Sequence, residues 1–175
     1  TQGASILCGS RSLFLDRSVS TAPFEPWAAE VESSGRRALF VALDGRIAAM
    51  FAVEENPLPG AADTIRRLSL LGLEPAMITS AEVEPARALG ARLGIERVHF
   101  GLREPDMSGV LEGITAAGDT AILVGNGPSF EEAARSATAA IALGSRASTL
   151  ADVDLKKHGL EAVVSIIASA RSARA

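Results

Sequence analysis

Residues 73–81, LEPAMITSA, and residues 120–127, TAILVGNG, decide the fold of this chain. Each is a short apolar run that ends on small or polar residues, namely Thr79 and Ser80 in the first, and Gly125, Asn126 and Gly127 in the second. Amphipathic stretches of helical period follow them, a pattern typical of buried parallel strands connected by helices. Because the carboxyl ends of parallel strands meet at one edge of a sheet, we expect the two polar ends to share one crevice.

The same alternation continues on both sides and predicts a doubly wound, mostly parallel, Rossmann-like α/β sheet. We expect strands at residues 73–78, 98–100, 120–125 and 139–143, and helices at residues 60–71, 82–93, 106–116 and 130–137. A last helix is expected over residues 155–175. Its apolar stripe is Leu160, Val163, Val164, Ile167 and Ala168, flanked by Lys156, Lys157, Arg171 and Arg174.

The amino-terminal residues 1–44 are predicted to form a small β-rich appendage. Asp44-Gly45 lies between the apolar runs 38–43 and 46–53, and this dipeptide between two such runs indicates an antiparallel hairpin. A helix is expected over residues 27–34, introduced by two prolines. Phe24 and Trp27 are interpreted as anchoring the start of that helix to the core, with a base-stacking pair as the alternative.

Composition restricts the class of protein. The chain has 175 residues, of which 47% are hydrophobic and 22% charged, which is ordinary for one globular domain with a small appendage. A net charge of -4 does not favour nucleic acid as a partner, and the single Cys8 excludes an intrachain disulfide. No apolar run approaches the roughly 20 residues that a membrane span needs. We therefore expect a soluble chain. Its abrupt start at Thr1 and its helical end suggest a piece of something larger.

Four segments carry a family resemblance. Gly45–Glu55 matches a strand leading into the domain, and Ala61–Ala81 matches a helix followed by an M-x-T-G-D loop. Ala91–Ile95 matches an A-x-x-x-G-I helix end, and Val124–Phe130 matches a V-G-D-G-x-N-D loop. In this order they resemble the phosphorylation domain of P-type cation-transporting ATPases, within the haloacid dehalogenase-like superfamily. The resemblance implies a nucleotide-binding remnant and connecting hairpin at residues 1–44, a phosphorylation domain at 45–154 and a helix leading toward a stalk at 155–175.

The resemblance also implies a phosphate site, and its nucleophile is missing. Transfer through an aspartyl phosphate needs a carboxylate, a hydroxyl, a lysine and carboxylates for Mg²⁺. The family's D-K-T-G-T loop does not occur in the sequence. In the broader D-x-D-G signature, Ala42 stands at the nucleophile position and Asp44 is a weak candidate that also fits a plain turn. Thr79 keeps the hydroxyl, while Ser80 and Ala81 replace the glycine and aspartate that follow it.

The lysine and the metal carboxylates are replaced as well. Met107 falls at the lysine position of the family's P-x-D-K motif. The metal loop has become Gly125-Asn126-Gly127-Pro128-Ser129-Phe130. We therefore predict an apolar crevice with vestigial phosphate-site positions, no catalytic residue and no bound metal. No cofactor is predicted for this chain, although the family uses ATP and Mg²⁺.

These observations favour one function and leave two alternatives open. The leading hypothesis is a soluble cytoplasmic piece of a P-type cation transporter, inactive by itself and structural or regulatory, whose partner is the remainder of a larger membrane protein. The alternatives are an interaction module that uses a crevice around Met107, Asn126 and Phe130, and a divergent phosphatase that uses Asp44. His99 and His158 are not expected to form a metal site.

The resemblance leaves one strand unaccounted for. In the family, the strand that bears the nucleophile lies at the centre of the sheet and precedes the residues present here. A gap is therefore expected between strands 76–79 and 121–124, and unpaired backbone in a core is costly. We predict that residues 38–43 fill this gap, with strand exchange between two copies of the chain as the alternative.

Overall fold

The structure is a computed structural model that describes residues 3–144, 148–155 and 159–173. The chain forms two compact units, each of which is described by itself. Unit 1 contains the residues up to Asn56 together with Ala81–Leu89, and unit 2 contains Pro57–Ser80 and the residues from Gly90 onward.

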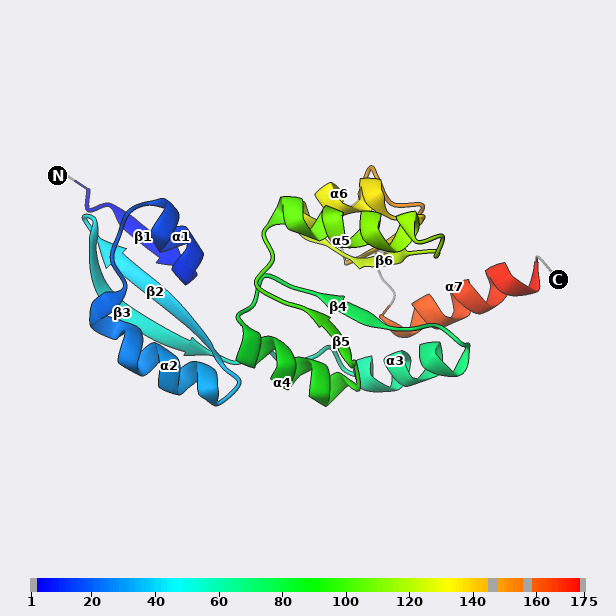
Figure 1. The fold of residues 1–175 in the computed structure, drawn as a ribbon, viewed down its shortest axis with the longest axis horizontal. Helices are drawn as coiled ribbons and strands as arrows, with labels where there is room; N and C mark the ends of the chain where they lie inside the picture. The colour runs from blue at the N-terminus through cyan, green and yellow to red at the C-terminus, as the bar shows by residue number, and fades with distance from the viewer. Residues whose placement is uncertain (1–2, 145–147, 156–158, 174–175) are drawn as a thin grey trace. The chain divides into compact units, whose positions relative to one another are not determined.

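Unit 1 is an antiparallel sheet with helices packed on one face (Figure 1). Its elements are β1 (Ile6–Gly9), α1 (Arg11–Asp16), a 3₁₀ turn η1 (Ala22–Phe24), α2 (Glu25–Ser33), β2 (Arg37–Leu43) and β3 (Arg46–Val53). The alternation in β2 turns one set of side chains inward, and Phe40 packs there against Phe14 with ring centroids 5.7 Å apart. The β-rich appendage is thus confirmed.

The hairpin between β2 and β3 is also confirmed. Asp44 has φ 48° and Gly45 has φ 76°, so both central residues of the turn are left-handed, as the favoured two-residue hairpin turns require. Asp44 also fastens the turn to Ser5. Its carboxylate accepts the Ser5 N–H at 2.8 Å, and its own N–H donates to the Ser5 carbonyl at 2.8 Å.

The two aromatic residues Phe24 and Trp27 differ in burial. Phe24 packs against the core, as expected for an anchor at the start of a helix. Trp27 contacts Phe24 edge-to-face, with centroids 5.4 Å apart, but 56% of its surface stays exposed.

Unit 2 contains parallel strands and the helices that connect them (Figure 1). Its strands are β4 (Ala76–Ile78), β5 (Arg97–His99), β6 (Ile122–Gly125), β7 (Ala139–Leu143) and β8 (Val153–Leu155). The helices are α3 (Ala61–Leu70), α4 (Val83–Leu93), α5 (Glu104–Ala116), α6 (Gly127–Ala133), the 3₁₀ turn η2 (Ala134–Ser136) and α7 (Glu161–Ser172), with the first part of α4 grouped in unit 1. Among the described residues, no helix has the length and apolar character needed to cross a membrane.

The predicted α/β fold with parallel strands is confirmed, and the expected elements from residue 60 to residue 143 are all present. The predicted start of the carboxyl-terminal helix, at residue 155, is wrong. Leu155 ends the short strand β8, and the helix begins only at Glu161. Lys156, Lys157, His158 and Arg174, which entered the expectations for this region, lie outside the described residues.

The prediction for residues 38–43 is wrong. These residues lie in β2, which pairs with β1 on one side and β3 on the other, so no edge of β2 is left for another sheet. In unit 2 the strands form two separate hydrogen-bonded groups, β4-β5 and β6-β7-β8. The expected interruption of the parallel sheet is therefore present in the described structure.

Helices α3 and α7 lie side by side in unit 2 (Figure 1). Val163 and Ile167 of α7 are buried in a cluster that includes Leu68 and Leu71. The guanidinium of Arg171 in addition donates to the Leu71 carbonyl at the end of α3. Apolar packing and a cap on an unsatisfied carbonyl thus join the two helices.

Candidate functional site

Thr79 follows β4 directly and is held by its backbone. Its N–H donates to the His99 carbonyl at 2.9 Å, and its carbonyl accepts the Leu102 N–H at 3.1 Å. Thr79 is half-buried, whereas Ser80 is exposed. The expected hydroxyl position therefore exists at a strand end, fixed by the neighbouring strand β5 and the loop after it.

The turn after β6 brings Gly125, Asn126 and Gly127 to the start of α6. Gly127 has φ 80°, a left-handed conformation that glycine adopts at no steric cost. Asn126 is exposed, and its amide makes no capping hydrogen bond to α6. A Cβ at Gly125 would stand 3.1 Å from a ring carbon of Phe130, so a side chain here would press against the ring.

Met107 does not face an open crevice. Only 9% of its surface is exposed, and it packs in a cluster with Leu111, Ala121 and Ala133. Ile78, the residue before Thr79, packs against the same cluster. The position that the resemblance assigns to a lysine is therefore part of the hydrophobic core beside the end of β4.

Phe130 fills the corresponding place beside the end of β6. It is 5% exposed and packs with Ala134, Ala140 and Ala142. Met107 and Phe130 are thus buried in two separate apolar clusters, and the apolar crevice stays a prediction.

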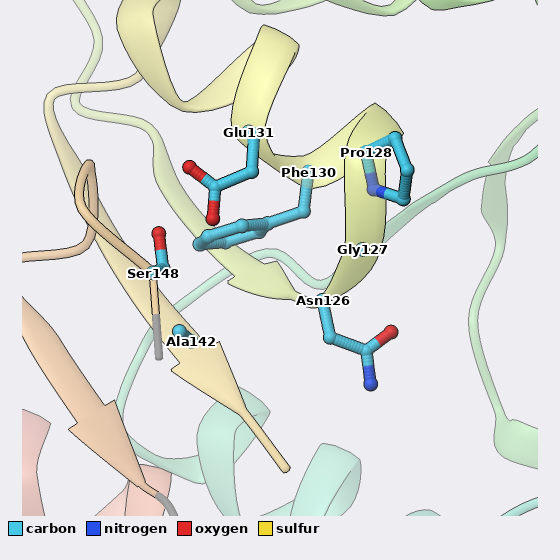
Figure 2. A pocket seen from close by; sticks show the side chains of 7 residues that line it. All are labelled: Asn126, Gly127, Pro128, Phe130, Glu131, Ala142 and Ser148. Carbon is cyan, nitrogen blue, oxygen red and sulfur yellow. The ribbon is translucent and has the colours of Figure 1, made fainter. Parts of the chain in front are cut away.

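A small pocket remains next to Phe130, with a volume of about 140 Å³. Its walls are Asn126, Gly127, Pro128, Phe130, Glu131, Ala142 and Ser148. Figure 2 shows the Glu131 carboxylate and the Ser148 hydroxyl on one side of the ring, while the Asn126 amide points away from it. Sequence reasoning did not single out Glu131 and Ser148 as neighbours. Their separation along the chain gives no periodic signal, because a whole strand lies between them.

The pocket offers few groups that could hold a metal or a phosphate. Glu131 is the acidic side chain in its lining, and Mg²⁺ usually needs carboxylates together with phosphate oxygens. Within the described ranges, His, Cys, Asp and Glu side chains form no group of three or more suited to a metal ion. The nearby polar groups have structural partners. The Ser129 hydroxyl donates to the Glu104 carboxylate at 3.1 Å, and the Arg103 N–H donates to the Asp106 carboxylate at 3.3 Å.

The weak nucleophile candidate is engaged elsewhere. Asp44 belongs to unit 1, where its carboxylate serves the hairpin turn through Ser5. The positions in unit 2 are organised around two apolar clusters, with Met107 in one and Phe130 in the other.

The charge network that the sequence did not reveal lies in unit 1. Arg11 donates to Glu25 at 2.9 Å, to Glu32 at 3.1 Å and to Glu82 at 3.2 Å, and its guanidinium lies 5.7 Å from the Phe40 ring centroid. The hydrogen bond from Arg11 lowers the pKa of Glu25 below its usual value. The bond to Glu25 likewise raises the pKa of Arg11.

Comparison with known proteins identifies the family. Residues 3–138 match the haloacid dehalogenase-like hydrolase family. The chain is 32% identical over 147 residues to the probable copper-exporting P-type ATPase V of Mycobacterium tuberculosis, covering 82% of this chain and 19% of the relative. It is 26% identical over 166 residues to the copper-transporting ATPase RAN1 of Arabidopsis thaliana, covering 93% of this chain and 17% of the relative. The chain thus spans about a fifth of the length of these relatives.

Solved structures show the same fold. A zinc-transporting PIB-type ATPase in the E2.Pi state aligns over 98% of this chain and 28% of its own, with a TM-score of 0.67 and 22% identity. The catalytic CPx-ATPase domain CopB-B aligns over 75% of this chain and 54% of its own, with a TM-score of 0.62 and 18% identity. The match over residues 3–138 shows that the chain belongs to the haloacid dehalogenase-like hydrolase family, and its 32% identity to a copper-exporting P-type ATPase relates it to the metal-transporting P-type ATPases.

Proposed function

We propose that this chain is a structural or regulatory part of a metal-transporting P-type ATPase and that it does not transfer phosphoryl groups by itself. Its partner is the remainder of the transporter, and its place is the portion of that protein outside the membrane. Neither ATP nor Mg²⁺ is proposed as a ligand of these residues on their own.

The burial of Met107 and Phe130 is the observation that carries this proposal. Both side chains stand where the family has charged groups, and both are packed in apolar clusters. In the transition state of phosphoryl transfer, negative charge is spread over the phosphoryl oxygens. Removal of one hydrogen-bond donor that stabilises this charge typically raises the activation free energy by about 3 to 4 kcal/mol. A methionine and a phenyl ring cannot supply that stabilisation.

The alternative of an interaction module is weakened because two of its three residues are buried. It requires Met107 and Phe130 to meet a partner, but they are 9% and 5% exposed. Only Asn126 among its three residues is on the surface. The scaffold role is therefore preferred for this face of unit 2.

The direct test is an activity measurement on the purified chain. We expect no ATP hydrolysis, no hydrolysis of a generic aryl phosphate and no acid-stable phosphoenzyme in the presence of Mg²⁺. The matched variant is Asp44→Asn, because asparagine tolerates the left-handed turn and removes only the carboxylate. Turnover by the wild type that disappears in Asp44→Asn would overturn the proposal and establish the phosphatase alternative.

A further inference from the structure

The pocket beside Phe130 contains polar groups that the vestigial phosphate-site positions do not explain. Glu131 and Ser148 line it, and neither is a position that the family resemblance assigns to phosphate or metal. Figure 2 shows both polar groups on one side of the Phe130 ring. The pocket therefore combines a carboxylate, a hydroxyl and an aromatic ring in one place.

The Ser148 hydroxyl is held in position by the segment that follows it. It accepts the Leu150 N–H at 3.2 Å, and Leu150 packs against the apolar cluster of Phe130. Asp152 fastens the same segment to β7, because its carboxylate accepts the Ala140 N–H at 2.8 Å and its own N–H donates to the Ala140 carbonyl at 2.9 Å. A hydroxyl oxygen has two lone pairs, so Ser148 can accept a second hydrogen bond from a ligand.

The Glu131 carboxylate has no cation beside it in the described part of the chain. Arg135, four positions further on, forms no ion pair with it there. Glu131 is half-buried next to the Phe130 ring. A carboxylate that has lost part of its water is stabilised by a cation, and it repels phosphate and other anions. The ligand is therefore expected to carry a positive charge.

The size and the walls of the pocket restrict that cation. The volume of about 140 Å³ corresponds to about four or five water molecules of about 30 Å³ each, so it admits about five non-hydrogen atoms. The Phe130 ring, Pro128 and Ala142 form an apolar wall for a short methylene chain, and an aromatic ring attracts a cation near its face. Mg²⁺ fits poorly, because Glu131 is the acidic side chain in the described lining and Mg²⁺ prefers several oxygen ligands.

Hydrogen-bond donors distinguish between the organic cations of this size. A primary ammonium has three N–H donors, which the two carboxylate oxygens of Glu131 and the hydroxyl oxygen of Ser148 can match. A guanidinium has five donors and would leave some of them against the apolar wall, whereas a quaternary ammonium has none and would leave the hydroxyl unused.

We propose that this pocket binds a primary alkylammonium group. Glu131 supplies the counter-charge, Ser148 accepts a hydrogen bond, and the Phe130 ring contacts the methylene chain and the cation. The group belongs either to a free amine or to a lysine side chain of a partner protein, which offer the same chemistry. Such binding does not depend on the proposed function of the chain.

The test is a titration of the full 175-residue chain with n-butylammonium chloride at constant ionic strength, followed by the amide NMR signals. We expect selective shifts at Glu131, Ala142 and Ser148. The expected dissociation constant is about 1 to 10 mM, as is usual for a ligand of about five non-hydrogen atoms. Neutral 1-butanol and anionic butyrate should bind at least about tenfold more weakly, because neither forms a charge-assisted pair with Glu131.

Three variants assign the binding to these side chains. Glu131→Gln keeps the shape and removes the charge, and we expect at least about tenfold weaker binding. Phe130→Leu keeps the wall apolar but removes the ring, and we expect binding about threefold to tenfold weaker. Glu132→Gln is the matched control. It removes the same charge from the neighbouring exposed residue, which does not line the pocket, and it should bind like the wild type.

A second titration separates the two sources of the group. The probe is the tripeptide Gly-Lys-Gly with an acetylated amino end and an amidated carboxyl end, so that its ammonium is on the lysine side chain. Binding of both probes, each weakened in Glu131→Gln, would support a site open to a lysine of a partner protein. Binding of butylammonium alone would support a site for free amines.

Four outcomes would overturn the proposal. They are the absence of selective shifts, equal affinity for butylammonium and butanol, equal affinity of the wild type and Glu131→Gln, and shifts of the same signals by Mg²⁺ at lower concentrations than butylammonium requires. The last outcome would assign the pocket to a divalent cation. None of these outcomes measures ATP hydrolysis, so this experiment and the activity assay fail independently of each other.

Discussion

The two units of this protein treat charge in opposite ways. Unit 1 gathers three carboxylates around Arg11 and keeps an aspartate in its hairpin turn. Unit 2 places Met107 and Phe130, both buried, at positions where its family relatives are expected to carry charge. The polar groups in unit 1 have partners that explain them as parts of the fold, whereas Met107 of α5 and Phe130 of α6 are packed in the core beside the strand ends of unit 2. Unit 1 thus keeps charged groups that have structural partners, whereas unit 2 buries apolar side chains at these two positions.

The largest effect is expected from restoring an acid at Phe130. Phe130→Asp places a carboxylate among Ala134, Ala140 and Ala142, and an unpaired buried charge costs about 3 to 5 kcal/mol in unfolding free energy. Denaturant unfolding monitored by circular dichroism measures the loss. The control, Phe130→Leu, keeps the site apolar and should lose less. Equal stability of the two variants would mean that the site is solvated, and the contrast between the units would then disappear.

A smaller effect is expected from Arg11. Arg11→Met keeps the aliphatic stem over Phe40 but removes the bonds to Glu25, Glu32 and Glu82. The network is partly exposed, with 30% of the Arg11 side chain accessible, so we expect a loss of about 1 to 2 kcal/mol. Thermal unfolding measures it, with Arg36→Met as a surface control. A neutral result would show that the network does not stabilise unit 1.

The stability difference between wild type and Arg11→Met is also expected to depend on pH. The folded-state pKa of Glu25 lies below its usual value of 4.5, so its contribution is present above that value and is lost as pH falls through the lower folded pKa. The stability difference between wild type and Arg11→Met should therefore be full at pH 7 and shrink below about pH 4. A difference that grows on acidification would contradict the assignment.

The smallest effect concerns Asp44. Asp44→Ala removes the bond to the Ser5 N–H and places alanine at φ 48°, which together should cost about 1 kcal/mol. Asp44→Asn should cost only a few tenths of that, because asparagine tolerates this conformation. Chemical denaturation of the three proteins provides the ranking. If both variants were equally destabilised, the carboxylate charge itself would matter, which would bring unit 1 closer to a functional interpretation.

Short-range patterns account for what the sequence predicted correctly. The Asp44-Gly45 turn and the helical periods of α3 to α5 depend on neighbouring residues, so they are visible in the sequence. Thr79 and the turn Gly125-Asn126-Gly127 also lie at strand ends as expected, since each follows an apolar run, whereas Met107 lies in α5. Whether the chain has lost activity stays a prediction, because the fold does not measure a rate.

The predictions that were wrong or missing concern contacts between residues far apart in the sequence. Residues 38–43 have an apolar pattern that suits a buried strand of either kind, and only their pairing with β1 and β3 decides the sheet. The three residues of β8 are too few to show a period. The Arg11 network joins residues up to 71 positions apart, and no local motif indicates such a contact.

The link between α3 and α7 has a mechanical consequence. The Arg171 guanidinium donates to the carbonyl of Leu71, the residue after α3, and Ile167 of α7 packs in one cluster with Leu68 of α3. Residues of both helices line a cavity of about 560 Å³. The two helices are therefore expected to move together as one packed pair. A displacement of α7 would therefore be transmitted to α3 through this hydrogen bond and this apolar packing.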